Sequence, residues 1–192
     1  GLFRYVQIRT ARSTKQVMVT IVTGQSAFPS AKNFVNALLK RHPEITTVVQ
    51  NINDKQTTMV LGDREKVLFG PGFIEDVLCK KRFRISSRSF YQVNSLQTEK
   101  LYNIALDYAG FSGKERILDA YCGIGTIGII ASDRCKEVLS VELNAEAVKD
   151  AKINAKLNDA DNVEVYKNDA GRFMEDMAAK KEKLDILFMD PP

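Results

Sequence analysis

Residues 119–126 read Asp-Ala-Tyr-Cys-Gly-Ile-Gly-Thr, and this stretch decides the fold. Apolar residues precede it and helix-forming residues follow it, so we predict a strand, a glycine-containing turn and a helix. Glycine lets a ligand approach the backbone closely, and the first turn of a helix offers unpaired N–H groups. Gly123, Gly125 and Gly128 also match the Gly-x-Gly-x-x-Gly spacing of dinucleotide-binding turns. The stretch therefore predicts a ligand-binding turn in an α/β fold.

Strands and helices alternate around this turn. The predicted strands are Arg116–Tyr121, Glu137–Glu142, Val163–Lys167 and Leu184–Met189, and the predicted helices are Gly125–Asp133, Ala145–Asn158 and Arg172–Lys180. This alternation predicts a parallel sheet with right-handed crossovers, the first half of a doubly wound sheet. A further helix begins at Asn94 or Ser95 and ends at Gly110. Its predicted apolar face consists of Leu101, Ile104, Ala105 and Tyr108.

The first half of the chain predicts a small α+β domain. Its predicted strands are Arg4–Thr10, Gln16–Thr23 and Thr46–Ile52. A helix through Phe34, Leu38 and Leu39 is expected to end before Pro43. We place the domain boundary after residue 90, which gives an α+β domain over residues 1–90 and an α/β domain over residues 91–192.

The two halves differ in charge. Residues 1–90 contain 15 Lys/Arg and 6 Asp/Glu (net +9), whereas residues 91–192 contain 13 Lys/Arg and 18 Asp/Glu (net −5). A basic half suits a polyanionic partner, and an acidic half suits a cationic small molecule. Two solvated faces of one domain would explain the same charges equally well.

Composition excludes several classes of protein. No apolar run reaches the roughly 18 residues of a membrane span, and Gly1–Arg4 lacks the apolar core of a secretory signal. The cysteines Cys79, Cys122 and Cys135 fit no metal-binding spacing, so we expect reduced thiols, no metal and a cytoplasmic location. His42 is the single histidine, so we expect no histidine-based catalysis.

Acidic residues follow each predicted strand of the second half. They are Asp119, Glu142, Asp169 and Asp190. In α/β folds, ligands bind beyond the carboxyl ends of the strands. A carboxylate at Asp119 disfavours a dinucleotide pyrophosphate and suits a cofactor with an ammonium and a sulfonium, and Glu142 suits the two hydroxyls of a ribose. The acids therefore favour S-adenosylmethionine (SAM) over NAD.

These motifs resemble those of class I SAM-dependent methyltransferases. Residues 89–94, Ser-Phe-Tyr-Gln-Val-Asn, and residues 99–102, Glu-Lys-Leu-Tyr, resemble more closely the signature of the RNA uracil-5-methyltransferase family, as does the turn at residues 119–126. The resemblance is firm from about residue 69 onward. It implies a Rossmann-like class I SAM-dependent methyltransferase domain preceded by a small α+β domain, and formation of 5-methyluridine in RNA, with rRNA favoured over tRNA.

The resemblance also implies site residues. The cofactor-binding positions carried over from the family are Gln92, Tyr121, Gly123, Gly125, Glu142, Asp169 and Asp190. In the family, a cysteine attacks C6 of uracil, C5 takes the methyl group, and a base removes the C5 proton. Both catalytic residues follow the Asp-Pro-Pro element, here residues 190–192, so we expect none in this chain and no activity from it alone. Cys122 is interpreted as a packing residue of the turn.

The apolar strand before residue 190 suits a buried position between two neighbours, and we therefore expect the chain to be one piece of a longer enzyme.

A basic, aromatic stretch precedes the family signature. We predict that Lys81, Arg82, Arg84 and Arg88 contact RNA phosphates, with Phe83 or Tyr91 available for packing or stacking. A solvated strand face is the alternative for these cations. No DNA or membrane partner is expected, and the sequence leaves the oligomeric state undetermined.

Two other functions remain open at this point. One is a SAM-dependent methyltransferase that acts on an exocyclic amine of a nucleic-acid base, since such enzymes also use an Asp-Pro-Pro element. The other is a non-catalytic SAM- or RNA-binding module.

Overall fold

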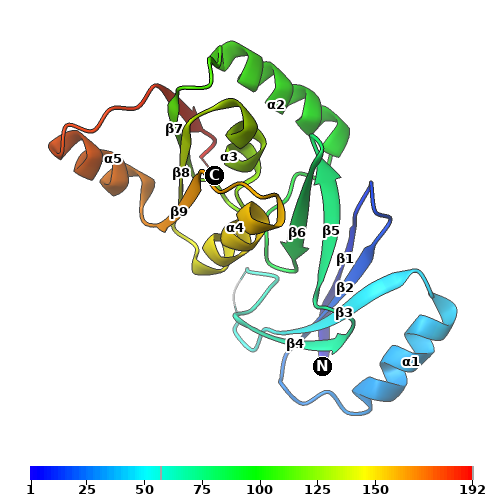
Figure 1. The fold of residues 1–192 in the computed structure, drawn as a ribbon. Helices are drawn as coiled ribbons and strands as arrows, with labels where there is room; N and C mark the ends of the chain where they lie inside the picture. The colour runs from blue at the N-terminus through cyan, green and yellow to red at the C-terminus, as the bar shows by residue number, and fades with distance from the viewer. Residues whose placement is uncertain (57, 192) are drawn as a thin grey trace. The chain divides into compact units, whose positions relative to one another are not determined.

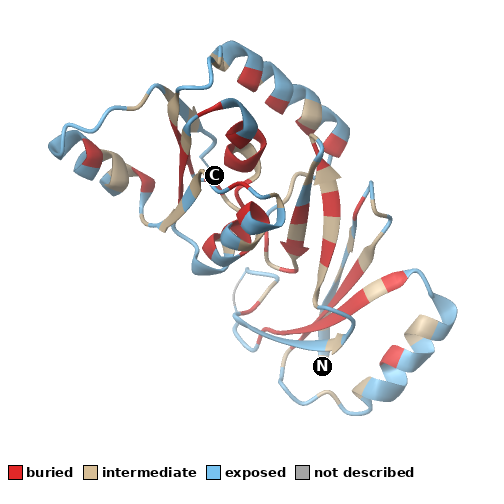
Figure 2. Ribbon diagram, viewed as in Figure 1, coloured by how far each residue is buried: buried red, intermediate tan, exposed pale blue. Residues whose placement is uncertain are grey.

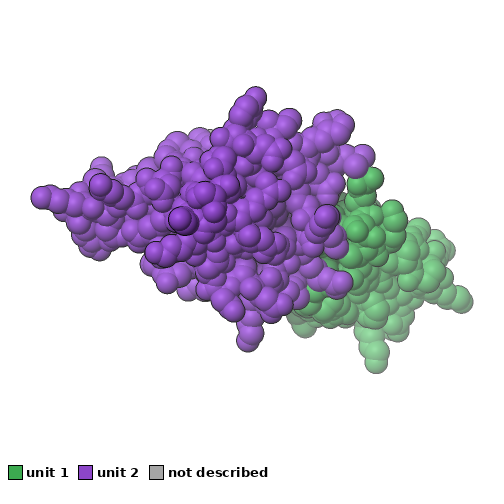
Figure 3. All heavy atoms as spheres, turned by 45° about the horizontal axis from the view of Figure 1, so that its top comes forward, with its two compact units in different colours: residues 1–76, 85–88 green, residues 77–84, 89–192 purple. Residues whose placement is uncertain are grey.

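The computed structural model describes residues 1–56 and 58–191. Within them the chain forms two compact units, coloured separately in Figure 3. Unit 1 contains Gly1–Asp76 and Ile85–Arg88, and unit 2 contains Val77–Arg84 and Ser89–Pro192, of which Pro192 lies outside the described residues. The division differs from a boundary after residue 90, because the hairpin at residues 73–86 contributes to both units.

Unit 1 is built around a four-stranded sheet (Figure 1). Its elements are β1 (Phe3–Thr10), β2 (Val17–Thr23), α1 (Ala31–Arg41), β3 (Ile45–Ile52) and β4 (Arg64–Phe69). The strand order is β1-β2-β3-β4, with β2 and β3 parallel and the outer pairs antiparallel. Val35 of α1 packs with Ile21 and Val48 in one apolar cluster. The predicted strands and the helix ending before Pro43 are confirmed, while β4 was not predicted.

A hairpin follows, in which β5 (Phe73–Leu78) pairs with β6 (Lys81–Ser86). Its two-residue turn is Cys79-Lys80, and both residues have positive φ, 48° and 67°. Such turns favour Asn and Gly, so the sequence carries no signal for this hairpin. Phe83 is fully buried on β6, at 0% exposure. Of the two roles predicted for Phe83, packing is therefore confirmed and stacking on RNA is excluded.

Unit 2 contains a parallel sheet in the order β10-β7-β8-β9. Its elements are α2 (Ser95–Ala109), β7 (Arg116–Ala120), α3 (Thr126–Ala131), a 3₁₀ turn (Ser132–Arg134), β8 (Glu137–Glu142), α4 (Ala145–Leu157), β9 (Val163–Lys167), α5 (Ala170–Ala179) and β10 (Ile186–Met189). Buried residues concentrate in the central strands β7 and β8 (Figure 2). The predicted alternation of strands and helices and the parallel sheet are confirmed.

The predicted apolar face of α2 is wrong. Leu101, Ile104 and Tyr108 are 60%, 54% and 88% exposed, whereas Tyr102 and Leu106 are buried. The helix is therefore rotated by about one residue from the predicted orientation, and an aromatic side chain with a polar tip faces the interior. The caps are as predicted: the Asn94 side chain accepts the Gln97 N–H, and Gly110 ends the helix with φ 63°.

β10 is an edge strand of the sheet within the described residues, with β7 as its partner. Leu187 and Met189 are 44% and 51% exposed on it. The sequence pattern instead suggested a strand buried between two neighbours.

Candidate functional site

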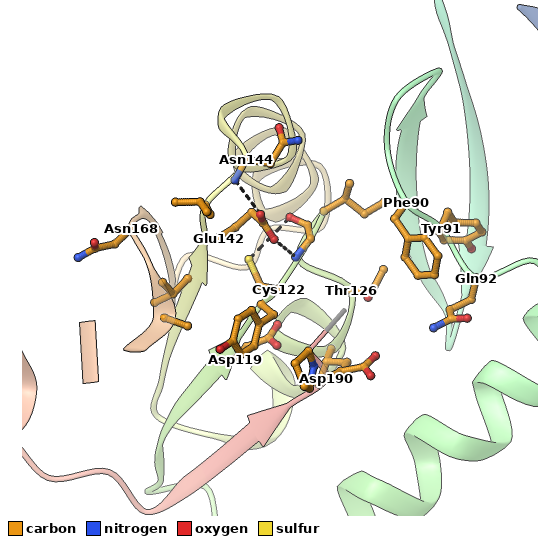
Figure 4. Close-up of a pocket in the computed structure, with 18 of the residues that line it drawn as sticks. Phe90, Tyr91, Gln92, Asp119, Cys122, Thr126, Glu142, Asn144, Asn168 and Asp190 are labelled. Carbon is orange, nitrogen blue, oxygen red and sulfur yellow. Dashed lines mark hydrogen bonds between the residues drawn. The ribbon is translucent and has the colours of Figure 1, made fainter. Parts of the chain in front are cut away.

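A cavity of about 690 Å³ lies in unit 2 at the carboxyl ends of the parallel strands (Figure 4). Its walls come from the segment before α2, from the turn after β7, and from the residues that follow β8, β9 and β10. Of the seven predicted cofactor residues, six line this cavity: Gln92, Tyr121, Gly123, Glu142, Asp169 and Asp190. The fold thus brings together residues that are nearly 100 positions apart in the sequence.

The turn after β7 is held in an unusual backbone conformation. Tyr121, Gly123 and Gly125 all have positive φ, at 62°, 56° and 83°. For Tyr121 this left-handed conformation costs of order 1 kcal/mol or more, and such strain concentrates at functional sites. Gly125 caps α3 and donates its N–H to the Cys122 carbonyl at 2.8 Å, so it shapes the turn without lining the cavity.

Gly128 lets α3 lie close to the sheet. A Cβ on this residue would lie 2.8 Å from Ser140 Oγ and 3.0 Å from Asp119 Oδ2. The Gly128 N–H donates to Asp119 Oδ2 at 2.8 Å. The third glycine of the spacing therefore positions the helix over the first acid of the site.

Glu142 joins the two turns that border the cavity. Its carboxylate accepts the Gly123 N–H at 3.0 Å and the Asn144 N–H at 2.7 Å, the dashed bonds in Figure 4. Each oxygen keeps a free lone pair, because a carboxylate accepts up to about four hydrogen bonds. Glu142 can therefore hold both turns and still accept two hydroxyls of a ligand.

The other predicted acids lie at the rim. Asp169 caps α5, where its Oδ1 accepts the Arg172 N–H at 3.0 Å. Asp190 follows β10 and is exposed. Asp119, by contrast, is 2% exposed. Burial raises the pKa of Asp119 to about 7, opposed by the Gly128 N–H and reinforced by the charges of Asp190 and Glu142.

Charge in the cavity is of one sign. The described lining residues include the four carboxylates named above and contain no Lys, Arg or His. This lining attracts a cationic ligand and repels phosphates. Burial also raises the pKa of the Cys122 thiol, and Asp119 and Glu142 add to the effect. Cys122 is therefore held as a neutral thiol.

Several lining residues were not predicted as site residues. They are Phe90, Tyr102, Thr126, Leu143, Asn144 and Asn168. The buried Tyr102 places its hydroxyl 3.3 Å from Thr126 Oγ1, and its pKa is raised, mainly by burial. Phe90, Tyr102 and Thr126 lie inside the motifs quoted above, which could have identified them. Leu143, Asn144 and Asn168 follow strands β8 and β9 and reach the cavity through the sheet topology.

The cations predicted to contact RNA are largely engaged within the chain. Lys81 is 15% exposed and pairs with Asp133 at 2.7 Å, and Arg88 lies 3.6 Å from Asp63. Arg84 Nε is buried. Arg82 is exposed, and its backbone is held by the Asn158 side chain, which accepts its N–H at 2.8 Å.

This combination of parallel sheet, glycine turn and strand-end acids defines the Rossmann-like fold of SAM-dependent methyltransferases. A Pyrococcus abyssi tRNA (uracil-54, C5)-methyltransferase, solved in complex with S-adenosyl-L-homocysteine, matches with a TM-score of 0.77 and 27% identity over 100% of this chain and 44% of its own. The M. jannaschii tRNA m1G37 methyltransferase matches with a TM-score of 0.50 and 13% identity over 95% of this chain and 57% of its own, which supports the fold alone.

The chain belongs to the family described as conserved hypothetical protein 95, whose model matches residues 96–192. Curated relatives named uncharacterized RNA methyltransferase, from Halalkalibacterium halodurans and Clostridium acetobutylicum, are 40% and 41% identical over 192 residues. These matches cover 100% of this chain and 42% of each relative, so the chain spans less than half of their length. No helix in the described part of the chain combines the length and apolarity needed to cross a membrane.

Proposed function

We propose that the acidic cavity binds SAM. The observation that carries this proposal is a lining with four carboxylates and, among the described residues, no cation. SAM carries an ammonium and a sulfonium, which such a lining attracts, whereas the pyrophosphate of NAD would be repelled. Glu142 has the free acceptor capacity for the ribose hydroxyls. The P. abyssi neighbour, solved with S-adenosyl-L-homocysteine, supports the assignment.

The polypeptide that carries this chain is, in this proposal, an RNA methyltransferase that forms 5-methyluridine. Support comes from the names of the curated relatives and from the P. abyssi enzyme at 27% identity. Within the chain, Phe90, Tyr91 and Gln92 of the uracil-family signature line the cavity. Phe90 and Tyr121 are 74% and 38% exposed beside the acids, and aromatic faces at such a site suit a nucleobase taken out of its stack.

The nucleophile and the base are proposed to come from outside these 192 residues. A cysteine nucleophile needs a thiolate. Burial raises the pKa of all three thiols, Cys79, Cys122 and Cys135, with burial the largest cause in each case. These three cysteines form no disulfide within the described residues, which suits the cytoplasmic location that we propose.

For RNA contact, the proposal now depends most on Arg82. Of the four cations predicted in this stretch, Lys81, Arg84 and Arg88 are at most partly exposed, whereas Arg82 is exposed. The substrate is proposed to be rRNA, as the sequence resemblance favours, and tRNA is the second substrate to test because the P. abyssi enzyme is named for tRNA.

The test is methylation by the complete natural polypeptide. Labelled SAM is supplied with rRNA and tRNA transcripts, and the RNA is digested to nucleosides for mass spectrometry. The proposal expects labelled 5-methyluridine, absent from a Glu142→Ala control. A methylated exocyclic amine would replace the uracil assignment with the amine-methyltransferase alternative, and SAM binding without transfer to either RNA would favour a non-catalytic module.

A further inference from the structure

Asp119 differs from the other acids of the cavity in its burial. Its carboxylate lies between β7 and α3 and accepts a hydrogen bond from the Gly128 N–H. The residue opposite it on β8 is Ser140, which is 0% exposed, and its Oγ has no hydrogen-bond partner within the described residues. A buried carboxylate normally accepts two or three hydrogen bonds or pairs with a cation. Asp119 therefore has too few partners for a permanent negative charge.

The groups that face Asp119 are acidic or neutral on every side. Glu142 at the end of β8 and Asp190 after β10 both act on it electrostatically. The turn contributes the neutral thiol of Cys122, and α2 contributes the hydroxyl of Tyr102, which feels the charges of Asp119 and Asp190. Among the described lining residues there is no cation to balance these charges. The empty cavity therefore disfavours ionisation of Asp119.

A bound sulfonium would reverse that balance. It would add one positive charge to the cavity, where opposite charges attract more strongly than in bulk water. The thioether product has the same amino-acid and nucleoside groups and lacks that charge. With SAM in the cavity, Asp119 would therefore face one more positive charge than with the product, which keeps the ammonium and lacks the sulfonium.

We propose that Asp119 distinguishes the sulfonium cofactor from its thioether product by exchanging one proton with solvent, ionised with SAM bound and neutral in the empty and product-bound cavity. The inference rests on the proposed function, since it takes SAM as the ligand. During transfer the sulfur–methyl bond breaks, its electron pair stays on sulfur and the methyl group bonds to the acceptor. A proton from solvent then neutralises the Asp119 carboxylate. The proton returns to solvent when the next SAM binds.

The charge exchange has a measurable consequence. With Asp119 titrating near pH 7 in the empty cavity, the affinity for SAM rises with pH while the affinity for S-adenosylhomocysteine does not follow. The ratio of the two affinities should increase about tenfold between pH 6 and pH 8 and level off above that. Groups that the two ligands share affect both affinities equally and leave the ratio unchanged. The pH dependence of the ratio therefore measures the effect of the positive charge on sulfur.

The experiment is isothermal titration of the complete natural polypeptide with SAM and with S-adenosylhomocysteine. Each titration is run at pH 6.5 in two buffers of different ionisation enthalpy, which gives the number of protons released. We expect most of one proton released with SAM and nearly none with S-adenosylhomocysteine. Asp119→Asn should abolish the release, whereas Asp176→Asn, which removes an exposed carboxylate on α5 outside the cavity, should keep it.

The outcomes separate this inference from the proposed function. SAM binding without proton release, or release that persists in Asp119→Asn, overturns the inference and leaves the proposed function standing. Absence of SAM binding overturns both. If Asp119→Asn does not fold, the affinity ratio of the unmodified polypeptide decides: a ratio that stays constant from pH 6 to pH 8 contradicts the inference.

Discussion

Two regions of the molecule use buried polar side chains differently: the loop held by Asn51 and Asn53, and the cavity beside Asp119. In unit 1, the Asn51 amide donates to the Gly62 carbonyl at 3.1 Å and to Glu65 Oε1 at 2.9 Å, and its oxygen accepts the Gly62 N–H at 2.7 Å. Asn53 donates to the carbonyls at 59 and 60 in the same way. In unit 2, the Asp119 carboxylate accepts the Gly128 N–H, and Ser140 Oγ has no partner within the described residues.

This difference in hydrogen bonding distinguishes side chains that hold the structure together from side chains that can bind a ligand. A saturated buried amide holds a loop and has no capacity left for a ligand. An undersatisfied group beside a cavity costs stability and retains that capacity, as is common at functional sites. Saturated buried amides such as Asn51 should therefore matter for stability, and undersatisfied groups beside the cavity, such as Asp119, for cofactor binding.

The largest effect is expected from Glu142→Ala. It removes the acceptor for the Gly123 and Asn144 N–H groups together with the proposed ribose contacts. Hydrogen bonds to a charged group contribute about 1.5–3 kcal/mol each, so SAM affinity should fall by about 100-fold or more. Isothermal titration measures this, with Glu146→Ala, an exposed acid in the first turn of α4, as the control. A loss of less than tenfold would contradict the role of Glu142.

The next effect tests unit 1. Asn51→Ala leaves the buried N–H and carbonyl of Gly62 without their partner. Each unsatisfied group costs about 1–3 kcal/mol, so the free energy of unfolding should fall by about 2–4 kcal/mol in urea denaturation. Asn33→Ala, at an exposed position of α1, should change it little. The affinity for SAM should be unchanged. A changed affinity would show that Asn51 contributes to cofactor binding as well as to stability.

Asp119→Asn tests how much the buried Asp119 carboxyl lowers the free energy of unfolding. For a carboxyl whose folded-state pKa of about 7 exceeds its unfolded value of 3.8, the native state binds more protons, so this group lowers stability as pH rises from about 4 to 7. A pKa difference of about three corresponds to about 4 kcal/mol. The variant should therefore be more stable than the parent by up to about 4 kcal/mol at pH 8, and by little at pH 4. Urea unfolding at both pH values checks the sign, and a variant less stable at pH 8 would contradict it.

The smallest effect is expected from Arg82→Glu. Loss of one exposed cation should weaken RNA binding about three- to tenfold and lower the slope of log affinity against log salt by about 0.7. Filter binding at several salt concentrations measures both quantities. Lys180→Glu, an exposed cation just after α5, makes the same charge change elsewhere. If the two variants weaken RNA binding equally, Arg82 acts only through the net charge of the protein and makes no specific contact with RNA.

Much of unit 2 could be predicted because its signals are local. The glycine turn at 119–126 and the acids after each strand follow the sequence order of the sheet, so Glu142 and Asp190 were placed correctly in the cavity lining. Tyr102 and Thr126 were not predicted as site residues, because their pairing depends on how α2 packs against α3.

Three features resisted prediction for physical reasons. The turn at Cys79 and Lys80 has positive φ without Gly or Asn, so the hairpin has no sequence signature. Phe83 and the cations beside it form a basic, aromatic pattern typical of RNA contact, yet Phe83 is in the core. The apolar residues Leu101, Ile104 and Tyr108 of α2 face solvent, which helical periodicity alone cannot reveal.

The central claim is that the acidic cavity selects a cationic cofactor. Isothermal titration of the complete natural polypeptide with SAM and, in parallel, with NAD tests it most directly. The account predicts saturable 1:1 binding of SAM that is lost in Glu142→Ala, and no binding of NAD. Binding of NAD, or SAM binding that Glu142→Ala leaves intact, would contradict it.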